Sequence, residues 1–256
     1  MKSFKYFLML CAVALSFAAC EYDNYEGPEY YLKGNLFYGD SNIVFDSNVS
    51  ILKACQKGYG KTDGGQSIRI SDDGTFSQLF FEGDYWLTLA NNQYPYMFPD
   101  FPSLGNGLGY DSVYMHIDDD QQINFECIPY YVFDEITYTP LDENSTTLDV
   151  TFTFRRNDDP RLPEDLPYVK RTFLYAGINQ HVNTGTTLSK GSAPMKITTE
   201  KTVTIKLDLS KYRSSTYYPN NYRDYLYFRI GLQIDGLDGY YLLSKLVRVD
   251  NVPYVE

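Results

Sequence analysis

The sequence has few of the residues on which most catalytic and metal sites depend. Its 256 residues include four cysteines, two histidines and one tryptophan. His116 and His181 are far apart, and no Cys-x-x-Cys pair or Cys/His cluster is present, so the ligand spacing of a zinc site is missing. The Gly-x-Ser-x-Gly, His-Glu-x-x-His and Walker motifs are missing too. The sequence therefore predicts no metal, no cofactor and no catalytic residue.

Positive charge is also scarce. Lysine and arginine together number 22, against 33 aspartates and glutamates, which gives a net charge of −11. An acidic surface repels the phosphates of nucleic acids and of anionic lipid headgroups, so neither is an expected partner. The apolar content of 43% is enough for folded cores. Tyrosine is abundant, with 26 residues, and it suits both sheet surfaces and wet binding faces.

Residues 1–19 have the layout of a secretory signal peptide. Two lysines precede an apolar run from Phe7 to Ala19, which is shorter than the about 20 apolar residues that span a membrane. Small residues then lead directly to Cys20, which resembles a bacterial lipobox, although Phe17 stands where an aliphatic residue is usual. We expect Cys20 to be the first residue of the mature protein and to carry the lipid anchor. An ordinary secreted protein, cut near Ala19, is the alternative.

The rest of the chain consists of short segments with the alternation of β-strands and no long amphipathic helical pattern. In one of them Tyr85, Leu87 and Leu89 share the face expected in the core, while Trp86 points to the other side. About seven such segments in each half predict an all-β protein with two tandem β-sandwich domains. The expected organisation is a lipidated tether at 20–29, a first sandwich at 30–129 and a second at 130–256.

Several motifs resemble known bacterial families. Gly34, the run Asp73-Gly74-Thr75-Phe76 and the run from Gly83 to Leu87 resemble a transthyretin-like or carboxypeptidase-regulatory-like sandwich. Together with CEYDNYEGP, CIPYY and YLYFRIGLQIDGLDGYYLLSKLVRV, they make the mature chain similar to a Bacteroidetes lipoprotein family of unknown function, the family numbered 3823.

The resemblance implies a regulatory-like N-terminal domain and an immunoglobulin-like C-terminal domain. It also implies partners, because such proteins are encoded with starch-utilisation-type outer-membrane transporters and the lipoproteins paired with them. The acids that follow Cys20 resemble the export signals of surface lipoproteins, which places the protein at the outer membrane, facing the cell surface. The family defines no catalytic residue.

Two aromatic-rich segments, 91–111 and 212–225, are the candidate contact sites. Loops longer than about 12 to 15 residues are usually functional or disordered, and so many aromatics argue against disorder. The rings can stack on the apolar face of a sugar, dock a partner protein or pack as a satellite core. The candidate residues, including the tryptophan on the strand that enters the first segment, are Trp86, Tyr94, Tyr96, Phe98, Phe101, Tyr110, Tyr217, Tyr218 and Tyr222.

The remaining side-chain chemistry leaves alternatives open. Cys55 and Cys127 stay in the mature chain, where an oxidising compartment allows a disulfide, but free buried thiols fit equally well. Residues 118–120 are three aspartates that offer oxygen ligands for Ca²⁺, although a solvated turn is the preferred interpretation.

These observations predict a non-enzymatic surface lipoprotein, an accessory component of a glycan-uptake system that binds polysaccharide or oligosaccharide or docks on the transporter complex. A surface enzyme that hydrolyses glycan or peptide is the alternative. Among 33 acids some pair can always be found, so spacing in the sequence cannot identify the two carboxylates that a glycosidase needs.

Overall fold

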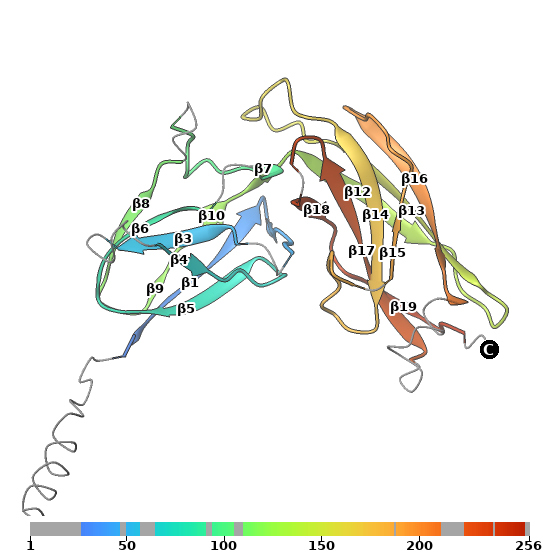
Figure 1. Cartoon of the computed structure of the whole chain (residues 1–256), viewed down its shortest axis with the longest axis horizontal. Coiled ribbons are helices and arrows are strands. Elements are labelled where there is room, and N and C mark those ends of the chain that lie inside the picture. The colour runs from blue at the N-terminus through green and yellow to red at the C-terminus, as the bar shows by residue number, and fades with distance from the viewer. Residues whose placement is uncertain are drawn as a thin grey trace, which may run out of the picture.

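The computed structural model is built from strands arranged in two domains that lie side by side (Figure 1). The predicted all-β class is confirmed. The described part of the chain contains no helix with the length and apolarity to cross a membrane. Residues 1–26, with Cys20, and residues 211–222, with Tyr217, Tyr218 and Tyr222, are outside it. The structure describes residues 27–46, 50–56, 65–90, 94–104, 110–186, 188–210, 223–237 and 239–253.

The first domain is assembled from short strands in two main sheets. Its strands are β1 (Tyr30–Tyr38), β2 (Ser41–Asn42), β3 (Leu52–Gln56), β4 (Gly65–Ile68), β5 (Thr75–Phe80), β6 (Gly83–Leu89), β7 (Tyr96–Met97), β8 (Val113–Ile117), β9 (Gln121–Gln122), β10 (Phe125–Glu126) and β11 (Ile128–Pro129). In one sheet β1 pairs with β2 and β5 antiparallel and with β9 and β10 parallel. The other sheet has the order β4-β3-β6-β8, and β7 pairs with β11.

The side chains of this domain follow the alternation expected from the sequence. On β6, Tyr85, Leu87 and Leu89 are buried, and Trp86 points to the other face, as predicted. Gly34 is required because a Cβ at this position would lie 1.7 Å from the carbonyl oxygen of Ile123. Its cross-strand partner in the β1–β5 register is Phe76, which is also buried.

The turn that leads into β5 is fixed by Asp73 and Gly74. The Asp73 carboxylate accepts hydrogen bonds from the Thr75 backbone N–H, at 3.1 Å, and from the Thr75 hydroxyl, at 2.7 Å. Gly74 has φ of +81°, a conformation that side chains with a Cβ rarely adopt. The Asp-Gly-Thr-Phe run therefore acts as a turn followed by a core residue, since Phe76 is 4% exposed.

The second domain has two antiparallel sheets. Its strands are β12 (Tyr131–Tyr138), β13 (Thr147–Arg156), β14 (Val169–Gly177), β15 (Leu188–Gly191), β16 (Glu200–Asp208), β17 (Tyr225–Ile234), β18 (Tyr241–Leu243) and β19 (Val247–Asp250). One sheet has the order β12-β13-β16, and the other has β15-β14-β17-β18, with β19 also on β17. On β13 the buried side chains alternate with threonines that hydrogen-bond to threonines of β16, so one face of this sheet is core and the other is wet.

The two domains meet over a continuous hydrophobic core rather than through a free linker. β11 ends at Pro129 and β12 begins at Tyr131, so a single residue joins the domains. The Tyr94 ring of the first domain lies 5.0 Å, centroid to centroid, from the Tyr240 ring of the second. One cluster of buried side chains extends from β1 of the first domain to β19 of the second. The relative position of the domains is therefore set by packing.

Charged and polar contacts also cross the junction. Arg161 donates two hydrogen bonds to the Glu126 carboxylate, at 2.6 and 2.7 Å. Arg229, only 5% exposed on β17, pairs with Asp72 at 3.1 Å. The buried Arg229 favours one domain orientation, because a shift of the domains would leave its desolvated charge without Asp72.

Candidate carbohydrate-binding sites

The aromatic segment predicted as a contact site lies mostly inside the protein. Tyr94, Tyr96, Phe98 and Phe101 are 2%, 5%, 4% and 1% exposed. The rings contact one another, with centroids 5.9 Å apart for Tyr94 and Phe98 and 6.5 Å apart for Phe98 and Phe101. The Tyr94 hydroxyl donates to the Ser50 carbonyl oxygen at 2.8 Å, so its polar end is satisfied within the fold.

The contact prediction is therefore wrong for Tyr94, Phe98 and Phe101, because a buried ring has no face open to a ligand or partner. The rings pack, as the third alternative predicted, but they do so within the main core rather than as a satellite core, and they help to join the domains. Tyr96 is equally buried, but it also borders the cavity between the domains described below. Tyr110 is half-buried and packs against the main core.

Trp86 lies on the outer face of sheet β4-β3-β6-β8, beside Tyr114 of β8. The Tyr114 side chain is 56% exposed. Their ring centroids are 5.4 Å apart and the ring planes are tilted by 58°. The Tyr114 hydroxyl donates to Asp84 Oδ1 at 2.7 Å, and His116 Nδ1 lies 2.8 Å from the same oxygen. These hydrogen bonds lower the pKa of the Asp84 carboxyl and raise that of the His116 imidazole. Trp86 remains a candidate contact residue, half-buried and next to an open tyrosine.

Cys127 and Asp120 have structural roles. Cys55 and Cys127 are free thiols, so the disulfide alternative is wrong. Cys127 is fully buried, and burial raises the pKa of its thiol well above the ordinary value, which makes it unreactive. The Asp120 carboxylate accepts the Tyr31 N–H at 2.7 Å and pairs with Lys33 at 3.3 Å. Within the described ranges no cluster of His, Cys, Asp or Glu is suited to hold a metal ion.

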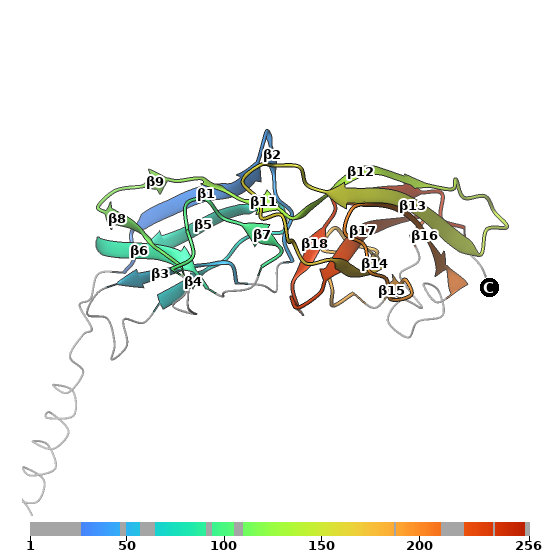
Figure 2. The same ribbon diagram turned by 90° about the horizontal axis from the view of Figure 1, so that it is seen from above.

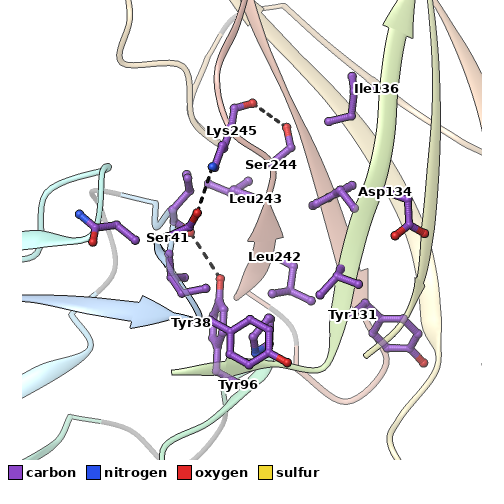
Figure 3. A pocket seen from close by; sticks show the side chains of 16 residues that line it. Tyr38, Ser41, Tyr96, Tyr131, Asp134, Ile136, Leu242, Leu243, Ser244 and Lys245 are labelled. Carbon is purple, nitrogen blue, oxygen red and sulfur yellow. Dashed lines mark hydrogen bonds between the residues drawn. The ribbon is translucent and has the colours of Figure 1, made fainter. Parts of the chain in front are cut away.

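A cavity of about 540 Å³ lies between the two domains (Figure 3). The β1–β2 hairpin and Tyr96 line it from the first domain, and β12 and the residues from Leu242 to Lys245 line it from the second. Sites for small ligands typically have volumes of about 300 to 1,000 Å³ and are common at domain interfaces. We call this space the interdomain cavity, and its size and place are those of a ligand site.

The interdomain cavity combines apolar walls with a few polar groups. Tyr38 and Phe133 are among the residues that line it, and both are half-buried rather than enclosed in the core. The Tyr38 hydroxyl donates to Asn157 Oδ1 at 3.1 Å, which holds the ring in place. Lys245 Nζ donates to Ser41 Oγ at 3.4 Å across the cavity, between the domains (Figure 3).

The polar groups of the cavity are placed by contacts outside it. The Asp134 carboxylate accepts a hydrogen bond from Arg155 Nε at 3.1 Å, and Asn42 Oδ1 accepts one from Asn35 Nδ2 at 2.5 Å. Apart from Tyr96, sequence analysis missed these lining residues, because they come from segments that only the fold brings together. A partly alternating run such as Tyr131–Tyr138 has no signal that distinguishes a cavity wall from a solvated face.

Comparisons with known proteins identify the first domain. Residues 30–128 match the model of the family described as "Protein of unknown function (DUF3823) N-terminal domain". The chain thus carries a DUF3823 N-terminal domain. The resemblance stated from the sequence is confirmed for this part, which begins with β1 and ends in β11. A search of curated proteins gave no match.

Solved structures share the fold of the DUF3823 domain and of the domain that follows it. A DUF3823 family protein from Parabacteroides merdae has a TM-score of 0.64 at 20% identity, covering 88% of this chain and 100% of that chain. A DUF3823 family protein from Bacteroides ovatus has a TM-score of 0.61 at 19% identity, and the match covers 87% of this chain and 99% of that chain. A Bacteroides uniformis protein described as a "putative carbohydrate binding protein" has a TM-score of 0.60 at 16% identity. That match covers 88% of this chain and 100% of that chain. At these identities the likeness is one of fold.

Proposed function

We propose that the protein is a non-enzymatic lipoprotein of the cell surface, anchored in the outer membrane through Cys20, that binds glycan as an accessory of an uptake system. The observation that carries this proposal is the interdomain cavity, in which half-buried aromatic rings stand beside an amide, a carboxylate and an ammonium group. A sugar ring has apolar C–H faces and a rim of hydroxyls, so it needs both kinds of surface. The description of the Bacteroides uniformis neighbour is in keeping with this class of ligand.

Binding is favoured over hydrolysis by the carboxylates of the cavity. A glycosidase needs two carboxyl groups about 5 to 9.5 Å apart across the scissile bond. Among the described residues that line the interdomain cavity, Asp134 is the one carboxylate, and it is already paired with Arg155 at 3.1 Å. The hydrolase alternative predicts release of product by the purified protein, and we expect none.

Calorimetry of the purified mature protein against a panel of oligosaccharides tests the proposal. Ser41 is exposed and lines the cavity, so Ser41→Trp should obstruct it without disturbing the core. We expect affinity for the best glycan to fall at least about tenfold, which is about 1.4 kcal/mol. Ser189→Trp, at an exposed position of β15 away from the cavity, is the matched control and should bind normally.

Three other results would change the proposal. If no glycan binds and a transporter co-purifies with the protein, docking replaces glycan binding as the function. If Ser41→Trp binds normally and Trp86→Ala does not, the site is the outer face with Trp86 and Tyr114. If Cys20→Ser leaves the protein in the membrane fraction, the anchor is not on Cys20.

A further inference from the structure

A second cavity, of about 740 Å³, lies on the outer side of β1 and β5 in the first domain. Its lining side chains include two cations, amides and hydroxyls, but no carboxylate among the residues that the structure describes there. This composition is unusual for a chain with 33 acids and a net charge of −11. We call this space the polar cavity. The residues used below are Lys33, Asn35, Asn42, Arg69 and Asn124.

The polar cavity offers mostly hydrogen-bond donors. Asn42 Oδ1 accepts from Asn35 Nδ2, and Asn124 Oδ1 accepts from the Asn35 backbone N–H at 3.1 Å. The acceptor oxygens of Asn42 and Asn124 are therefore already bonded, whereas their NH₂ groups have no partner in the described part of the chain. Such a wall is suited to oxygen-rich ligands.

Arg69 is the cation of this cavity that has no counter-ion among the residues that the structure describes. Lys33 is paired with Asp120 at 3.3 Å. The Arg69 backbone N–H donates to Gln78 Oε1, but within the described ranges its exposed guanidinium has no carboxylate or hydrogen-bond partner. A guanidinium presents donors in a planar fork that matches the two oxygens of an oxyanion.

The polar cavity and the interdomain cavity share Asn42, which lines both. Asn42 is on β2, which Figure 2 shows where the two domains meet. On the interdomain side, Lys245 donates to the hydroxyl of the adjacent Ser41 and pairs with no carboxylate in the described part of the chain. Each of the two cavities that meet at Asn42 of β2 is therefore lined by a cation that has no acid partner among the described residues.

We propose that the two cavities form one groove for an acidic oligosaccharide. Carboxylate or sulfate groups of the ligand lie against Arg69 and Lys245, and one sugar ring packs against Tyr38 and Phe133. This inference rests on the proposed glycan binding and names the class of glycan. The negative charge of the rest of the protein repels acidic glycans elsewhere, so the local cations determine where such a ligand binds.

Matched oligosaccharides test the charge preference by calorimetry. Oligogalacturonate is compared with its neutral methyl ester, and a sulfated galactan oligosaccharide with its desulfated form, which distinguishes carboxylate from sulfate. At least one acidic form should bind at least about tenfold tighter than its neutral counterpart, and its affinity should weaken with added salt. Arg69→Gln and Lys245→Gln should each reduce this difference.

Lys190→Gln is the control, because it removes one positive charge at an exposed position of β15. It should leave the acidic preference unchanged. If the neutral forms bind as tightly as the acidic ones, or if Arg69→Gln and Lys245→Gln have no effect, the acidic class is wrong while glycan binding stands. If no oligosaccharide binds at all, the inference and the proposed function both fail. Melting temperatures close to that of the wild type establish that the variants are folded.

Discussion

The segment from Tyr94 to Phe101 and the interdomain cavity are both at the domain junction, but they use aromatic side chains in opposite ways. In the segment, every ring is at most 5% exposed and contacts other rings or the shared core. In the cavity, Tyr38 and Phe133 keep part of their surface open. Aromatic density in the sequence thus indicates packing here. The rings suited to a ligand are those that the two domains leave partly uncovered.

The largest effect on stability is expected for the buried rings of the segment from Tyr94 to Phe101. Phe101 is 1% exposed and its ring lies 4.8 Å from that of Phe125. Phe101→Ala should lower the free energy of unfolding by about 3 to 5 kcal/mol, because it leaves a cavity in a packed core. Denaturant titration measures this change. A loss below about 1 kcal/mol would mean that the segment is not part of the core.

The ion pair at the junction should come next. Asp72→Asn leaves Arg229 buried without a counter-ion, and we expect it to destabilise the protein by about 3 kcal/mol. Asp119→Asn, in an exposed turn, is the control and should change stability by less than about 0.5 kcal/mol. Equal stability of the two variants would show that Arg229 does not depend on Asp72.

Substitution of a ring that lines the interdomain cavity should reduce glycan affinity more than it reduces stability. Phe133 is half-buried on β12, so Phe133→Ala should cost about 1 kcal/mol of unfolding free energy, less than a fully buried ring. Glycan affinity should fall at the same time, whereas folded Phe101→Ala protein should bind normally. Parallel calorimetry of the two variants makes the comparison. Normal affinity of Phe133→Ala would exclude its ring from the site.

The smallest expected effect is a pH dependence of the stability that Arg161 contributes through its contacts with Glu126 and Asp159. Hydrogen bonds from Arg161 lower the pKa of the Glu126 carboxyl and lower that of Asp159 to about 2. A carboxyl with a depressed folded-state pKa contributes stability above its unfolded pKa, about 4, and loses it as the pH falls toward the folded value. The melting temperature should therefore fall more steeply from about pH 4 to pH 2 in the wild type than in Arg161→Gln. Parallel profiles would contradict this linkage.

Local features of the fold could be predicted from the sequence because they depend on neighbouring residues. The alternation at Tyr85, Leu87 and Leu89 identified a strand and its core face. The Asp-Gly pair of the Asp73–Phe76 run is likewise a local signal that is typical of a turn. Both features need only the period of a strand or the conformational freedom of a glycine.

The site could not be predicted in the same way. Its walls are Tyr38, Phe133 and Lys245, which meet only because packing and the Arg229–Asp72 pair fix the orientation of the domains. Whether the rings of residues 94–101 are buried or exposed also depends on which other segments of the chain cover them. A loop rich in tyrosine and phenylalanine has the same composition whether it is open or covered.

A crystal structure of the mature protein with its tightest-binding oligosaccharide tests the central claim most directly. The account predicts a sugar ring in the interdomain cavity against Tyr38 and Phe133, with polar contacts from Asn42 and Lys245. A sugar stacked on Trp86 and Tyr114, with the interdomain cavity empty, would contradict it.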